Sequence, residues 1–174
     1  MSDIRLRDAA VADAAALSAL GRSSFDAAFG HLYRPEDLAG FLDTAHDPAA
    51  VVAEIADPAF IHRLAVDADD ILLGYCKLNA VSAYAGYSDA AAPIGLSQLY
   101  TDPALTGKGL GAALMDWALD TARGRGADAV QLSVWSENFG AQKFYQRYGF
   151  TKIADIDFWV GSHRDDEFLY ELRL

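Results

Sequence analysis

The sequence predicts a single α/β domain over residues 1–174, in which helices flank one mixed β-sheet. Residues 94–102 and 128–135 have the pattern of buried strands with a helix between them. Such a β-α-β unit joins parallel strands. Residues 59–67 and 70–81 instead form two strands that meet at the turn DADD, which predicts an antiparallel hairpin. Parallel and antiparallel pairs in one chain without a linker or repeat therefore indicate a single mixed sheet.

The other elements follow from local patterns. Pro35 and Pro48 stand where helices begin, and Asp47 before Pro48 is a suitable N-cap. Asn138 is a second candidate N-cap. We interpret residues 82–93 as a loop, either a lid or a disordered crossing. The predicted helices cover residues 11–25, 34–44, 47–57, 109–126 and 138–150, and further strands cover 3–9, 151–160 and 165–174.

Composition narrows the function classes. The net charge of −11 argues against a nucleic-acid partner, which requires a basic face, and mildly favours a cationic substrate. No apolar run reaches the roughly 18 residues of a membrane span, and the first residues have no signal-peptide pattern. The single cysteine cannot form an intrachain disulfide, and the four histidines show no metal-ligand spacing. We therefore expect a cytoplasmic protein without a metal.

A cluster of glycines opens the predicted helix 109–126. Gly107, Gly109 and Gly111 alternate with Lys108 and Leu110. The Walker A pattern fails because glycine follows Lys108. The dinucleotide pattern G-x-G-x-x-G/A matches in letters, but the loop does not follow its strand directly. Unpaired N–H groups at a helix start still favour a diphosphate, and a tight turn without a ligand is the alternative.

Two segments resemble the GCN5-related N-acetyltransferase family. They are LYTDPALTGKGLGAALMDWAL at residues 99–119 and LSVWSENFGAQKFYQRYGF at residues 132–150. Thr106 departs from the Arg or Gln that usually begins the family's glycine loop. SSFDAAFG at residues 23–30 and DFWVGSHRDDEFLYEL at residues 157–172 further resemble the spermine/spermidine acetyltransferase-like branch.

The resemblance implies that acetyl-CoA is the acetyl donor, bound in a cleft between splayed strands. Family members pair the pantetheine arm with the backbone of the central strand, which corresponds here to Leu99, Tyr100 and Thr101. A strand N–H would also polarise the thioester carbonyl. The pyrophosphate corresponds to the glycine loop, whose residues are Gly107, Lys108, Gly109, Leu110, Gly111 and Ala112.

The resemblance also implies that Tyr145 is the acid that protonates the leaving thiolate. Asn138 and Tyr145 are seven residues apart and share a helix face, with Ala141 between them as a small residue that lets the cofactor approach. The base is left open. Gln98 stands near the position of the family's glutamate and cannot accept a proton. The candidates are Glu137, Asp26, His31 and Tyr33, acting directly or through water, or a water chain alone.

The expected acceptor is a small-molecule amine, with a polyamine suggested by the branch resemblance. Aromatic walls beside an acidic residue suit a cationic amine. The candidate pocket residues are Phe25, Asp26, Phe29, Tyr33, Trp135 and Trp159. A protein or peptide acetyltransferase and a non-catalytic acetyl-CoA-binding domain are the alternatives. A homodimer is an expectation from the family.

Overall fold

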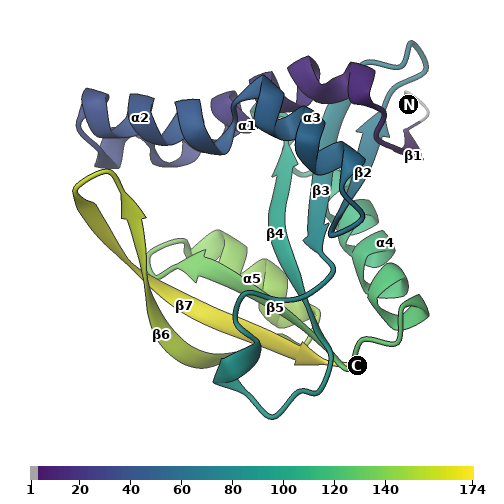
Figure 1. Cartoon of the computed structure of the whole chain (residues 1–174), viewed down its shortest axis with the longest axis vertical. Helices are drawn as coiled ribbons and strands as arrows, with labels where there is room; N and C mark the ends of the chain where they lie inside the picture. The colour runs from purple at the N-terminus through teal and green to yellow at the C-terminus, as the bar shows by residue number, and fades with distance from the viewer. Residues whose placement is uncertain (1–3) are drawn as a thin grey trace.

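The computed structural model describes residues 4–174, and one seven-stranded sheet forms its centre (Figure 1). The strand order is β1-β2-β3-β4-β5-β7-β6. The pair β4–β5 is parallel and the other neighbouring pairs are antiparallel, which confirms the predicted mixed sheet. The strands are β1 (Arg5–Asp8), β2 (Phe60–Val66), β3 (Leu72–Asn79), β4 (Pro93–Thr101), β5 (Ala129–Trp135), β6 (Thr151–Val160) and β7 (His163–Arg173).

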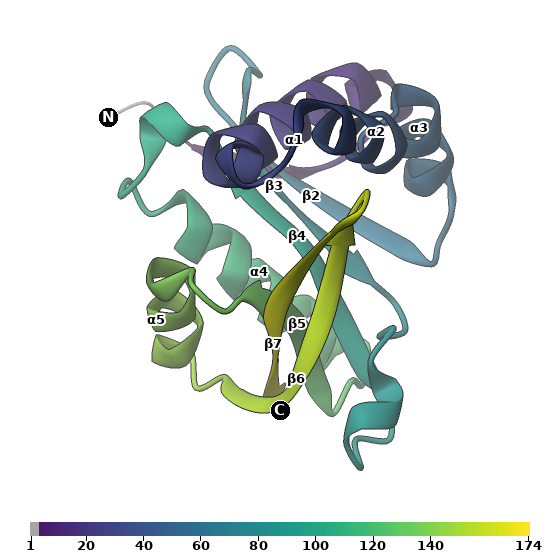
Figure 2. The same ribbon diagram turned by 90° about the vertical axis from the view of Figure 1, so that its left-hand side faces the viewer.

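Helices cover both faces of the sheet (Figures 1 and 2). The helices are α1 (Ala14–Phe29), α2 (Pro35–Ala45), α3 (Pro48–Ala56), α4 (Leu110–Gly124) and α5 (Phe139–Arg147). The first three lie on one face, and α4 and α5 lie on the other, where Leu114, Met115 and Phe150 belong to the largest buried cluster. Asp47 accepts a hydrogen bond from the N–H of Ala50 at 3.1 Å, which confirms the predicted N-cap of α3. Within residues 4–174, no helix combines the length and apolarity that crossing a membrane requires.

Strands β4 and β5 diverge along their length. Pro93, Ile94 and Gly95 pair with β5. Beyond that point β5 remains paired with β7 as far as Trp135, whereas β4 remains paired with β3 as far as Thr101. The splay expected from the family resemblance is therefore present, and one edge of β4 leaves the ladder.

A β-bulge at Ser97 changes which face of the sheet the end of β4 presents. Leu96 pairs with Leu78 and Gln98 pairs with Lys77, so Ser97 is an extra residue on β4. The insertion reverses the alternation of side chains. Leu96 packs in the cluster beneath α4, whereas Tyr100 packs in the cluster on the α1 face. No sequence pattern indicated this bulge.

The loop between β3 and β4 is neither a lid nor disordered. The Ser82 hydroxyl donates to Gln131 Oε1 at 2.6 Å, and the Ser88 hydroxyl donates to Glu171 Oε2 at 2.6 Å. These bonds hold the loop at the end of the sheet remote from α1 and α2 (Figure 1). The lid alternative does not fit the structure, because this loop enters β4 at Pro93, whereas the cavity described below is lined by Leu96–Thr101 and by no residue of the loop.

The β6–β7 hairpin reaches the helical layer formed by α1 and α2 (Figure 2). At the hairpin turn, the Ser162 N–H and hydroxyl both donate to the Asp37 carboxylate, at 3.2 and 3.0 Å. Val160 is fully buried against this layer, and the rings of Phe41 and Phe158 are 5.6 Å apart. The hairpin is therefore attached at its tip and closes one side of the space beside β4.

Candidate active site

A cavity of about 650 Å³ lies where β4 and β5 diverge. Its walls come from elements that are far apart in the sequence: α1, α2, β4, β5, α5 and the β6–β7 hairpin. The divergence of the two strands creates the space, and the helices and hairpin enclose it. The structure thus brings together the strand, the α5 residues and the aromatic residues that the sequence pointed to separately.

The β4 wall contains Leu99, Tyr100 and Thr101, the residues expected to pair with pantetheine. Their edge toward β5 has no strand partner in the described chain. Backbone N–H and C=O groups at such an edge require hydrogen-bond partners when they are shielded from water. An extended amide-bearing ligand could supply those partners.

The glycine loop lies outside the cavity, at the start of α4. Gly107 and Gly109 both have φ of +81°, in the left-handed region that glycine tolerates, and Gly109 is the N-cap. Lys108 is exposed. The Leu110 side chain is 2% exposed in the core, so only its backbone can face a ligand. The Thr106 hydroxyl donates to the Pro103 carbonyl at 2.9 Å, and so stabilises the preceding turn.

Helix α5 and its N-cap present three residues to the cavity: Asn138, Ala141 and Tyr145. Asn138 accepts a hydrogen bond from the Ala141 N–H at 3.2 Å, which confirms its role as N-cap. Burial raises the pKa of the Tyr145 hydroxyl above its ordinary value. At neutral pH this hydroxyl therefore carries a proton that it can donate.

Four of the six predicted pocket residues line the cavity: Phe25, Phe29, Tyr33 and Trp135. The rings of Phe25 and Phe29 are 5.1 Å apart, and Phe29 meets Trp135 edge-on at 6.0 Å. These contacts form a continuous aromatic wall between α1 and β5.

The other two predicted pocket residues, Asp26 and Trp159, do not line the cavity. Asp26 lies on the exposed side of α1, because the helical period places Phe25 and Phe29 inward instead. Trp159 is 57% exposed, and its neighbour Phe158 lines the cavity, because side chains alternate along β6.

Three of the candidate bases are exposed and do not line the cavity: Asp26, His31 and Glu137. Tyr33 does line it, but burial and a hydrogen bond to Asp165 raise its pKa, so it is a poor proton acceptor at neutral pH. Gln98 faces the cavity and accepts a hydrogen bond from the Tyr75 hydroxyl at 2.9 Å.

Two carboxylates that sequence reasoning missed line the cavity from β7. Asp165 and Glu167 are two residues apart and therefore lie on one face of the strand. Asp165 accepts a hydrogen bond from the Tyr33 hydroxyl, and its other oxygen is 3.1 Å from His163 Nε2. The alternation in DDEFLYEL shows that 165 and 167 share a face. Only the insertion of β7 beside β5 places that face on the cavity.

The cavity has an acidic character. The lining residues include no lysine or arginine from the described part of the chain. Burial lowers the pKa of His46, the histidine in the wall, to about 4, so its ring is neutral at pH 7. Burial, with a smaller contribution from Asp165, raises the pKa of Glu167 above its ordinary value. The electrostatics thus favour a positively charged ligand.

The residues at positions 4–174 contain no group of three or more histidine, cysteine, aspartate or glutamate side chains placed to hold a metal ion.

Comparisons with known proteins agree on one family. The model of the acetyltransferase (GNAT) family matches residues 24–150. An uncharacterised N-acetyltransferase of Lactobacillus delbrueckii is 29% identical over 177 residues, which cover 100% of this chain and 99% of the relative. An uncharacterised N-acetyltransferase of Mycobacterium tuberculosis is 31% identical over 159 residues, covering 90% and 95%.

The fold agrees as well. The crystal structure of PaiA N-acetyltransferase from Thermoplasma acidophilum, in complex with coenzyme A, matches with a TM-score of 0.79 at 20% identity over 99% of both chains. The family match over most of the chain, with a diverging β4–β5 pair of the expected kind, shows that this protein belongs to the GCN5-related N-acetyltransferase family.

Proposed function

We propose that the protein transfers the acetyl group of acetyl-CoA to the primary amine of a small cationic molecule, with a polyamine as the first candidate. The single observation that supports this most strongly is the composition of the cavity: Tyr145 in one wall, and Asp165 and Glu167 in another. A proton donor suits the leaving thiolate, and carboxylates suit an ammonium group. Acetyl-CoA is the cosubstrate that family membership provides, and the PaiA relative was crystallised with coenzyme A.

In this proposal the free edge of β4 holds the pantetheine arm along Leu99, Tyr100 and Thr101. A β4 N–H polarises the thioester carbonyl and stabilises the developing oxyanion. The pyrophosphate lies against the start of α4, where N–H groups and the helix dipole favour an anion. Phe25, Phe29 and Trp135 surround the acceptor, and Tyr145 gives its proton to the sulfur as the thiolate leaves.

The direct test measures donor and acceptor separately. Tryptophan fluorescence during an acetyl-CoA titration reports donor binding, and thiol release across an amine panel reports transfer. We expect binding, and fastest release with spermidine or another polyamine. Binding without thiol release on any amine would instead indicate a non-catalytic acetyl-CoA-binding domain. No binding at millimolar acetyl-CoA would contradict the proposal altogether.

A protein or peptide acceptor is less well supported. A peptide requires an open groove, whereas the hairpin tip is bonded to α2 through Ser162 and Asp37 and closes one side. Including a short peptide with a free N-terminus in the amine panel distinguishes the two acceptor classes. Faster thiol release with the peptide than with any small amine would reverse the assignment.

A further inference from the structure

We propose that Glu167 is the catalytic base, which takes a proton from the acceptor ammonium before the amine attacks the thioester. This inference rests on the proposed function and assigns a role that the sequence left open. The geometric basis is that Glu167 Oε2 is buried without a hydrogen-bond partner among the described residues, in a side chain that lines the cavity. Buried polar atoms without partners are rare in native proteins, and each requires an explanation. An ammonium group in the cavity would be the missing partner.

The other titratable groups of the cavity are less suitable. Both carboxylate oxygens of Asp165 already have neighbours, the Tyr33 hydroxyl and His163. The low pKa of His46 makes its ring a weak base. The pKa of Tyr100 and the pKa of Tyr145 are both raised, so these hydroxyls hold their protons at neutral pH. Glu167 is the lining group that combines a free acceptor atom with a charge that can be neutralised.

The surroundings of Glu167 raise the pKa of its carboxyl group, which makes the carboxylate a stronger base. The charged or titratable groups that face it are Asp165 on β7, Tyr100 on β4 and Tyr33 between η2 (Gly30–Leu32) and α2. A hydrogen bond with the Ser133 hydroxyl on β5 lowers the pKa of Glu167 and so offsets part of the increase that burial causes. A carboxylate pKa that is raised toward the working pH gives a more effective general base.

The step balances as follows. Glu167 accepts one proton from R–NH3⁺, and the nitrogen lone pair forms the C–N bond at the thioester carbonyl carbon. The C–S bond then breaks, its electron pair goes to sulfur, and Tyr145 protonates the thiolate. After attack the nitrogen carries two protons, and one of them passes to the Tyr145 phenolate and restores its hydroxyl. Glu167 then releases the proton that it accepted to solvent. The products are the acetamide, free coenzyme A and one proton.

The test compares E167Q, which keeps the size of the side chain, with D166N as the matched control, because Asp166 is the neighbouring exposed carboxylate on the opposite face of β7 and does not line the cavity. Thiol release is measured on the full chain with spermidine and with phenethylamine, from about pH 5.5 to pH 9.5. For E167Q we expect kcat to fall roughly 10²- to 10⁴-fold, with loss of the acid limb of the kcat–pH profile. Acetyl-CoA affinity by tryptophan fluorescence should remain within about twofold of wild type, because Glu167 lies on the acceptor wall. D166N should keep the acid limb.

Several outcomes would overturn the inference. A higher KM for the amine with unchanged kcat and an unchanged acid limb would make Glu167 an anchor for the cation. If E167Q does not fold, E167D provides the test. Its carboxylate should retain the acid limb of the kcat–pH profile but with a shifted midpoint. An acid limb with an unshifted midpoint would contradict the assignment. Wild-type protein that binds acetyl-CoA without releasing thiol on any amine would overturn both the base and the proposed function. Normal wild-type turnover with a fully active E167Q would overturn the base alone.

Discussion

Two tyrosines at the C-terminal end of α5 differ in what their hydroxyl groups face. The Tyr145 side chain lines the cavity, whereas the Tyr148 hydroxyl donates to the Ala112 carbonyl and to Asp116 on α4, at 3.3 and 3.1 Å. Tyr145 lies within α5, and Tyr148, three positions later, is the C-cap of the same short helix. They therefore offer a matched pair for separating proton donation from helix packing.

Tyr145→Phe should lower kcat by roughly 10²-fold or more, because removing a general acid costs about that factor. Its acetyl-CoA affinity should change little, since the ring and its packing remain. Tyr148→Phe should retain nearly wild-type kcat. Steady-state thiol release with titrated acetyl-CoA measures both constants. Equal turnover of Tyr145→Phe and wild type would remove Tyr145 from the acid role.

Gly109 provides a second comparison at the scale of one residue. Its φ of +81° is strained for any side chain, although nothing lies within 4 Å of an added Cβ. We expect Gly109→Ala to distort the start of α4 at a cost of about 1–2 kcal/mol and to raise the KM for acetyl-CoA more than it lowers kcat. Gly124→Ala, with equally open space and no positive φ, should leave that KM unchanged. If both variants behave alike, the start of α4 does not contact the donor.

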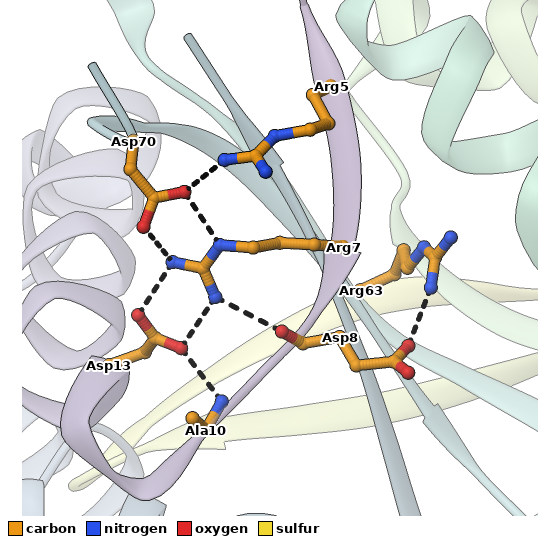
Figure 3. A network of polar contacts seen from close by, with 7 residues as sticks. All are labelled: Arg5, Arg7, Asp8, Ala10, Asp13, Arg63 and Asp70. Carbon is orange, nitrogen blue, oxygen red and sulfur yellow. Dashed lines mark hydrogen bonds and ion pairs between the residues drawn. The ribbon is translucent and has the colours of Figure 1, made fainter. Parts of the chain in front are cut away.

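At the scale of elements, Arg7 attaches strand β1 to two distant parts of the fold (Figure 3). Its guanidinium forms paired hydrogen bonds with Asp13, which precedes α1, and with Asp70 in the β2–β3 turn, at 2.8 to 3.0 Å. Arg5 makes one hydrogen bond to Asp70, at 2.7 Å, from a side chain that is 61% exposed. β1 is an edge strand of four residues, and these contacts add to the backbone ladder that pairs all four with β2.

Arg7→Lys should lower the free energy of unfolding by about 1–3 kcal/mol, because an ammonium cannot replace charge-assisted paired hydrogen bonds. Arg5→Lys should cost about 0.5 kcal/mol or less. The hydrogen bond to Arg7 lowers the pKa of Asp13. That stabilisation is thus complete above the ordinary aspartate pKa and is lost as pH falls through the lower folded value. Urea unfolding at neutral and acidic pH should show the Arg7→Lys deficit shrinking in acid, and a constant deficit would contradict the ion pair as its cause.

At the scale of the whole molecule, burial of His46 makes the stability of the fold depend on pH. It is 2% exposed, and its pKa of about 4 lies below the ordinary value of 6.5. The unfolded chain therefore binds a proton between these values that the folded chain does not. Stability should rise with pH across this window, by at most about 3 kcal/mol from this residue. Buried His62 shifts in the same direction.

His46→Gln should flatten the pH dependence of stability between about pH 4 and pH 6.5, because the group that titrates on unfolding is gone. The midpoint and slope of urea unfolding at several pH values measure the effect. His31→Gln, at an exposed position, is the matched control and should leave the dependence intact. An equally steep dependence in His46→Gln would assign the effect to other groups.

Local residue patterns were sufficient for the element order, the N-caps at Asp47 and Asn138, and the family resemblance. These features depend on neighbours within a few positions, so periodicity and capping chemistry report them directly. Because local patterns report only near neighbours, they did not reveal that Asp26 and Trp159 lie outside the cavity. The correct element was identified there, but a shift of one residue along a helix or strand turned the side chain from the cavity to solvent.

Long-range pairing decided which side chains form the acidic wall of the cavity. The bulge at Ser97 reorients Gln98 and Tyr100, and β7 lies between β5 and β6, which brings Asp165 and Glu167 to the cavity. Strand order and register depend on which distant segments bury each other, and that free energy is shared across the whole sheet rather than encoded in any short stretch. The sequence was therefore enough to indicate the donor, through the glycine loop and the α5 motif, whereas the acidic wall of the cavity, with a buried Glu167 Oε2 that has no hydrogen-bond partner among residues 4–174, exists only in the folded sheet.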